Sequence, residues 1–200
     1  MTSTIALLVP ACGGEQGPVE GRALEVGAAT TYSVTGIAAL PPARDVSVML
    51  TRLRNVTSSE VVIRSVEPLG VSVTAEGEAP ADILGVELAV RDPSLAETVP
   101  LGFYPGPRPA LEVDGSCVEQ PTIAAERFAL EPHAQTADEV YLVVRLRTSA
   151  PGTFRLDGQR VVYEAGGTVY RQDFLDGLEL EVRDGADPEL PAEQLACAAR

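Results

Sequence analysis

The chain has 200 residues, of which 45% are hydrophobic and 22% charged, a composition that suits one folded domain and excludes a disordered chain. Its 29 acidic residues outnumber the 15 basic ones, and the formal net charge of −14 opposes binding to nucleic acid and to anionic lipid headgroups. No apolar stretch approaches the roughly 18 residues that a membrane-spanning helix needs.

Residues 1–12 form a short apolar segment that ends in Cys12. The last four of these residues, VPAC, resemble a bacterial lipobox, in which an aliphatic and a small residue precede the cysteine. The resemblance implies that Cys12 is lipidated and heads the mature chain, so that the protein would touch a membrane only through an N-terminal lipid. No basic residue precedes Cys12, and we expect the natural start to lie further upstream. The alternative is a short tail whose cysteine has no role.

Residues 13–30 are rich in Gly, Glu and Ala without sustained periodicity, which predicts a flexible tether. A folded domain is expected over residues 31–185, followed by a tail over 186–200. Short, turn-bounded stretches of alternating hydrophobicity predict the strands of this domain. These stretches are 31–37, 45–55, 60–66, 70–75, 83–90, 128–130, 140–148, 154–156, 160–164, 168–172 and 178–182.

Two stretches give the clearest strand signals. In residues 140–147 four aliphatic side chains face one way, while Arg145 and Arg147 face the other. In residues 161–170 (VVYEAGGTVY) two β-rich triplets flank a glycine pair that supplies the positive φ of a tight hairpin. Many short strands and almost no helical periodicity predict an all-β antiparallel sandwich. One short helix is expected at 192–199, behind a proline that suits a first helical position.

The asparagine of the stretch Asn55-Val56-Thr57 has the form of a glycosylation acceptor. We interpret the stretch as a turn between two strands, because asparagine tolerates left-handed backbone and the hydroxyls that follow it can cap the turn.

Two longer stretches resemble known modules. Residues 50–70, with a strand, an asparagine, a small polar turn and a second strand, resemble a hairpin of immunoglobulin-like modules in bacterial envelope proteins and of domains named after abnormal spindle and hydin proteins. Residues 140–182 resemble the closing strands of uncharacterised secreted actinobacterial proteins. The resemblance implies an immunoglobulin-like sandwich in an extracytoplasmic protein, and it brings no catalytic residues with it.

Three cysteines are present, Cys12, Cys117 and Cys197. If Cys12 carries lipid, the other two remain as a pair that could form a disulfide in an oxidising compartment. Closing this loop would remove roughly 4 to 5 kcal/mol of unfolded-state entropy. The alternative is two unpaired thiols, one in a loop and one in the C-terminal helix.

His133, the only histidine, would have to serve as general base for any serine or cysteine nucleophile. The chain has no G-x-S-x-G turn, and we expect His133 to be exposed in a loop before the strand at 140–148. A hydrolase that uses His133 is kept as an alternative function.

No cofactor is expected, because the chain lacks the clustered Cys and His that zinc needs and the several Met and His that copper needs. Asp184, Asp187 and Glu189 lie close together in a turn-rich stretch but lack the residue order of a calcium loop. An acidic solvated turn is the prediction, and a cation-dependent adhesion module is a further alternative.

Residues 91–121 contain six prolines, which predicts a long and partly rigid loop. This loop carries Phe103 and Tyr104, which could contact a partner or could plug one end of the sandwich. The sequence as a whole predicts a non-enzymatic, lipid-anchored or secreted envelope protein with an interaction or structural role. Its partner would be an unknown envelope protein or a cell-wall component.

Overall fold

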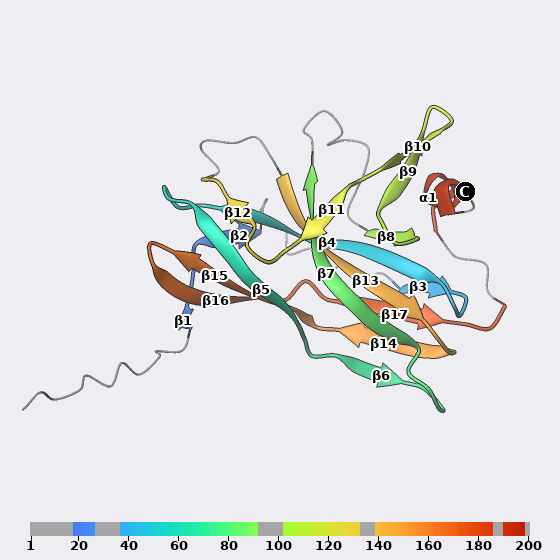
Figure 1. Cartoon of the computed structure of the whole chain (residues 1–200). Helices are drawn as coiled ribbons and strands as arrows, with labels where there is room; N and C mark the ends of the chain where they lie inside the picture. The colour runs from blue at the N-terminus through green and yellow to red at the C-terminus, as the bar shows by residue number, and fades with distance from the viewer. Residues whose placement is uncertain (1–17, 27–36, 92–101, 133–138, 186–189, 199–200) are drawn as a thin grey trace, which may run out of the picture.

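A computed structural model of the chain (Figure 1) describes residues 18–26, 37–91, 102–132, 139–185 and 190–198. These residues form seventeen β-strands and one short helix. The strands are β1 (Val19–Glu20), β2 (Leu24–Val26), β3 (Ile37–Leu40), β4 (Asp45–Asn55), β5 (Val61–Leu69), β6 (Ser72–Thr74), β7 (Ala81–Arg91), β8 (Gly102–Pro105), β9 (Ala110–Val113), β10 (Ser116–Glu119), β11 (Thr122–Ala124), β12 (Ala129–Leu130), β13 (Glu139–Thr148), β14 (Gly152–Leu156), β15 (Gly158–Ala165), β16 (Thr168–Phe174) and β17 (Leu178–Val182), and the helix is α1 (Ala192–Ala198).

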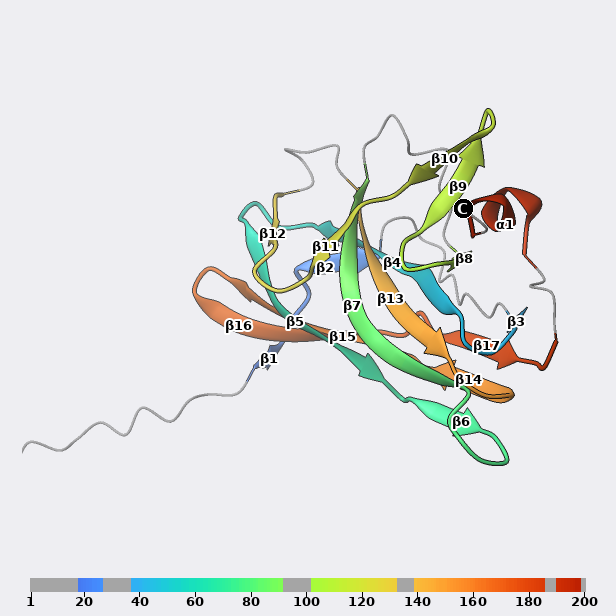
Figure 2. The same cartoon turned by 45° about the vertical axis from the view of Figure 1, so that its right-hand side comes forward.

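Two layers of strands face each other (Figures 1 and 2). The first layer is the sheet β11-β7-β13-β4-β2, with β8 also paired to β4. The second layer has two parts, β1-β16-β15-β5-β12 and β3-β17-β14-β6. The chain passes directly from one part to the other at three places, from β5 to β6, from β14 to β15 and from β16 to β17, with gaps of one to three residues. The expected all-β sandwich and its short C-terminal helix are confirmed, and the strand pairs are antiparallel except for β1 with β16 and β3 with β17.

The central strands follow the predicted alternation. On β13, Val140, Leu142, Val144 and Leu146 are buried in the core, whereas Arg145 and Arg147 point away from it and form ion pairs. The predicted hairpin is the connection of β15 to β16, which turns at two glycines with φ of 58° and 78°.

Two apolar clusters fill the space between the layers, one against β14 and β17 and the other against β5, β15 and β16. Where the clusters meet, the buried side chains of Thr51, Gln159 and Asp176 introduce a polar layer. The Thr51 hydroxyl donates to Oε1 of Gln159 at 2.9 Å, and Nε2 of Gln159 donates to the Asp176 carbonyl at 3.4 Å. A register shift in the β4–β13 pair, between Tyr141 and Val143, accompanies the entry of Thr51 into the core.

Asn55 ends β4 and organises the turn that follows. Its side chain is 1% exposed, and its Oδ1 accepts from the Thr57 amide at 3.0 Å and from the Thr57 hydroxyl at 2.7 Å. Its Nδ2 donates to the Ser59 carbonyl at 2.8 Å. The turn interpretation of this stretch is therefore confirmed, and the buried amide is fully used within the fold.

The tether expected over residues 13–30 is wrong for residues 18–26, which form β1 and β2. Leu24 is fully buried, and the Gly21 amide donates to the Arg171 carbonyl at 2.8 Å. A Cβ on Gly21 would lie 2.1 Å from the Tyr163 hydroxyl, so only glycine lets the chain pass this close. Within the described residues, no helix is long and apolar enough to span a membrane.

Candidate functional site

The proline-dense segment is not the continuous loop that its composition predicts. From residue 102 onward it forms β8, which pairs with β4, and then the β9–β10 hairpin. The hairpin turns at Asp114 and Gly115, with φ of 50° and 77°. An Asp-Gly pair between apolar residues is a strong hairpin signal, although the high proline content of the segment favours a loop. The β9–β10 hairpin and α1 add an outer layer beside the first sheet (Figure 2).

The interpretation of Phe103 and Tyr104 as exposed partner contacts is wrong. Phe103 is 6% exposed and belongs to the main core, and Tyr104 is fully buried against Met49, Tyr141 and other residues on the opposite face of the sheet. Because β8 pairs with β4, its alternate residues face opposite sides and both aromatic rings are covered. Both residues therefore stabilise the attachment of β8.

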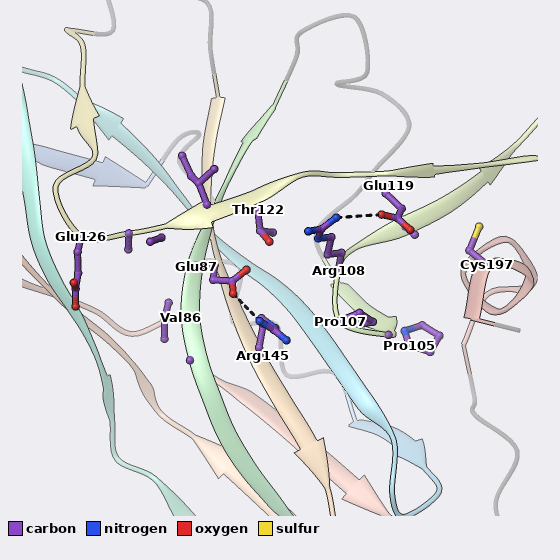
Figure 3. Close-up of a pocket in the computed structure, with 16 residues that line it drawn as sticks. Val86, Glu87, Pro105, Pro107, Arg108, Glu119, Thr122, Glu126, Arg145 and Cys197 are labelled. Atoms are coloured by element: carbon purple, nitrogen blue, oxygen red, sulfur yellow. Dashed lines mark hydrogen bonds and ion pairs between the residues drawn. The ribbon is translucent and has the colours of Figure 1, made fainter. Parts of the chain in front are cut away.

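A groove of about 790 Å³ lies between the first sheet and this outer layer (Figure 3). Glu87 of β7 and Arg145 of β13 lie side by side on its floor. The stretch Pro105–Arg108 forms one wall, and the stretch Thr122–Glu126 forms the other. Segments far apart in the sequence thus build one surface, which no local motif could reveal.

The floor of the groove is held by an ion pair. Nη1 of Arg145 donates to Oε1 of Glu87 at 2.8 Å. The Arg145 side chain is 30% exposed and the Glu87 side chain 24%. Burial alone would raise the pKa of the Glu87 carboxyl, but hydrogen bonds from Thr122 and Arg145 outweigh it and hold the pKa below its usual value. Glu87 therefore remains anionic at neutral pH and fixes the position of Arg145.

The rim carries further charges. Arg108 and Glu119 form an ion pair at 3.6 Å, with side chains 56% and 61% exposed, and such a pair contributes little to stability. Glu126 is exposed and has no ion-pair partner in the described part of the chain. The groove thus has three carboxylates against two guanidinium groups, and its rim has one acidic charge that a basic ligand can reach.

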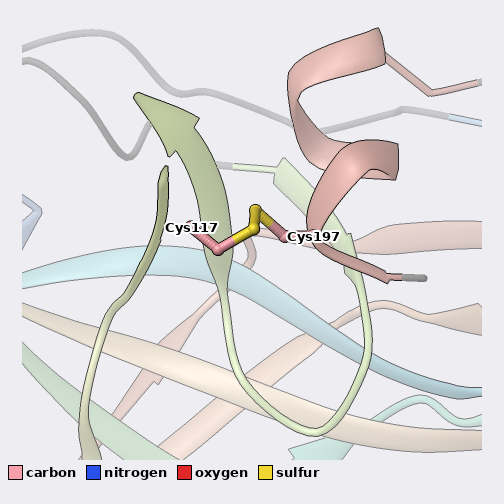
Figure 4. The surroundings of a disulfide bond; sticks show 2 residues. All are labelled: Cys117 and Cys197. Carbon is pink, nitrogen blue, oxygen red and sulfur yellow. A yellow bond between two sulfur atoms is a disulfide. The ribbon is translucent and has the colours of Figure 1, made fainter. Parts of the chain in front are cut away.

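The predicted disulfide between Cys117 and Cys197 is present (Figure 4). The two Cα atoms lie 5.5 Å apart, within the range that a disulfide can bridge. The bond joins β10 to α1, and Cys197 itself lines the groove. Since α1 also packs on β8 and β9, the disulfide closes the outer layer into one braced unit.

The groove suits recognition better than chemistry. Four of its five charged side chains form ion pairs with one another, its cysteine is bonded, and among its described lining residues there is no histidine. A preformed surface of mixed apolar and charged groups is typical of a binding site.

Several predicted site residues lie outside the described residues, namely Cys12, His133, Asp187 and Glu189. Asp184 is exposed, and the described part of the chain contains no group of three or more side chains that could hold a metal ion. The lipid anchor, the hydrolase and the cation-dependent module therefore stay predictions.

The chain matches no model of a known protein family and no curated protein. Among solved structures it is similar to the ASH/PapD-like domain of human CEP192 (PapD-like domain 7), with 10% identity and a TM-score of 0.35, over 93% of this chain and 99% of that chain. At this level of similarity, the role of that domain does not transfer to the present protein.

Proposed function

We propose that the protein is a non-enzymatic component of the cell envelope, lipid-anchored or secreted, whose sandwich binds a partner in the groove beside β7. The observation that carries the proposal is the groove itself, which the first sheet, the β9–β10 hairpin and α1 build and the disulfide braces. A fixed surface of this kind lowers the entropy lost on binding.

The proposed location draws support from two features. A disulfide that closes a loop of 80 residues persists in an oxidising compartment and is rare in a reducing one. The lipobox-like residues before Cys12 also suggest that the protein is exported. The partner would be an envelope protein or a cell-wall component.

Site-specific photocrosslinking in the native host tests the role of the groove. A photoreactive residue at Ile123, which is 42% exposed on the groove wall, should form an adduct with an envelope protein or a cell-wall fragment identified by mass spectrometry. Val169 is a matched control, since it is 38% exposed and lies on β16 in the other layer. Equal adducts at both positions, or none at either, would contradict the proposed interaction.

A further inference from the structure

The edge of the sandwich along β7 has two halves, and the chain itself covers one of them. Thr122–Ala124 pairs with β7 in the first layer, and β12 pairs with β5 in the second. Between these strands Ala125 is buried and Phe128 packs against the core. The crossing from one layer to the other therefore covers the cluster that lies against β5 and β15.

The other half of the same side has no such cover. Ala81–Val86 pairs with β13, and no strand in the described part of the chain pairs with its other edge. In the second layer β6 pairs with β14, and its other edge is likewise free among the described strands. A short connection joins β6 to β7, so the two free edges lie at one corner of the sandwich (Figures 1 and 2). The place between Ala81–Val86 and β6, where strand pairing is absent among the described residues, is called the opening below.

Apolar side chains line this opening from inside. Ile83 and Val86 of β7 are partly buried and pack against the core. Val73 lies opposite the buried Phe154 in the register of β6 and β14, so it is on the core side, yet it is 49% exposed. Val71 is 48% exposed. Apolar side chains at the edge of the core are thus partly exposed to solvent at this place.

Carboxylates surround the opening on its outer side. Asp82 and Glu87 alternate with the inward residues of β7, and Glu87 also forms the floor of the groove. Glu76, Glu78 and Asp82 are exposed and lack an ion-pair partner among the described residues. Val86 also lines the groove, so the opening adjoins the groove at this residue.

We propose that an extended segment of a partner protein, with alternating apolar and basic side chains, adds beside Ala81–Val86 and continues the line of β11. This proposal rests on the proposed function and names the chemistry of the partner. The inward side chains of the segment would contact Ile83, Val86 and Val73, and the basic ones would meet the carboxylates. A second copy of this chain is a poor occupant, because two molecules of charge −14 repel each other.

A bulge in β7 affects how much side-chain contacts and backbone hydrogen bonds each contribute to binding of the segment. The register with β13 passes from Arg145 opposite Gly85 to Leu146 opposite Ile83, which leaves Leu84 unpaired and 44% exposed. Bulges interrupt regular pairing at a sheet edge. The apolar side chains of the segment therefore carry more of the binding than its backbone does.

Hydrogen exchange with a defined peptide tests the proposal on the full chain. The probe is a peptide of about eight residues that alternates valine and lysine, the length of an ordinary strand. It should slow amide exchange at Ala81–Val86 and leave the β15–β16 hairpin unchanged. A peptide of the same composition with its valines and lysines in two blocks, and one that alternates valine and glutamate, should not.

Matched variants locate the contact. Val73→Asp should weaken peptide binding about tenfold, whereas Val169→Asp, at a comparably exposed valine, should leave it within about twofold. Should Val73→Asp fail to fold, Asp82→Arg at an exposed outward position gives the same test through charge. Unchanged exchange at Ala81–Val86, equal protection by the block peptide, or a dimer that protects this edge by itself would overturn the proposal. If Ile123 crosslinks to a partner while the β7 amides stay unprotected by the peptide, this inference fails alone and the interaction role stands.

Discussion

The side-chain amide of Asn55 donates a hydrogen bond to the main-chain carbonyl of Leu130, 2.8 Å away and 75 residues later in the chain. The bond joins the end of β4 in one layer to β12 in the other. Asn55 therefore ties the two layers together at the place where the chain turns from β4 into β5.

Asn55→Asp keeps the acceptor for Thr57 but removes both amide donors, which leaves the carbonyls of Ser59 and Leu130 without this partner. We expect a loss of about 1 to 3 kcal/mol in the free energy of unfolding, because the buried Leu130 carbonyl is left without this donor. Urea denaturation measures the change. Val56→Ala, at an exposed neighbour, should change stability little, and an equal loss in both variants would contradict the role of Asn55.

Asp176→Asn tests the polar layer in the core. Burial raises the pKa of the Asp176 carboxyl, and the neighbouring polar side chain of Thr51 only partly offsets this. The folded state therefore holds the proton more tightly than the unfolded state, and this contribution to stability is complete below the unfolded pKa and is lost as pH rises through the folded one.

The neutral amide should thus raise the melting temperature relative to wild type at neutral pH and have little effect near pH 3. Melting curves over a pH series give the comparison. Asp184→Asn, at an exposed carboxylate, is the control. A destabilising Asp176→Asn at neutral pH would show that the charged carboxylate is needed in the fold.

Removal of the disulfide in the double variant Cys117→Ser, Cys197→Ser should lower the free energy of unfolding by less than about 4 to 5 kcal/mol. The loss should fall short of this limit because α1 also packs on β8 and β9 without the bond. Chemical denaturation with and without reductant measures it. Reductant should destabilise the wild type and leave the double variant unchanged. A wild type that is equally stable with and without reductant would show that the bond does not form in solution.

Cys12→Ser tests the lipid anchor. In the native host, metabolic labelling with a clickable fatty acid should modify the wild type and not the variant, because the lipid is attached to the cysteine sulfur. The Cys117→Ser, Cys197→Ser variant serves as a control that keeps its label. Equal labelling of wild type and Cys12→Ser, or none in either, ends the lipoprotein hypothesis.

The sequence predicted the strands whose side chains alternate between a core and solvent. Val140 to Leu146 illustrate this, since a period of two has one explanation when four aliphatic residues and two arginines obey it. The hairpin at Gly166 and Gly167 was equally readable, because a turn with positive φ has strong residue preferences.

Other parts left no local signal. β2 contributes a single fully buried leucine, Leu24, and is positioned by Tyr163 and Gln172, both about 140 residues away in the chain. The groove depends on the meeting of Glu87, Thr122 and Arg145, which belong to three separate strands. Pairing over such distances is decided by the fold as a whole, and a single sequence read by pattern does not contain it.

The docking of β1 on the second layer limits how far the protein could stand from a membrane. Only six residues lie between Cys12 and Val19, the first residue paired to β16. However they are arranged, a separation of seven positions spans at most about 25 Å. A lipid on Cys12 would thus hold the β1 end of the sandwich against the bilayer. In both views α1 and the β9–β10 hairpin lie across the molecule from β1 (Figures 1 and 2), so the groove would open toward the surrounding space, within reach of large partners.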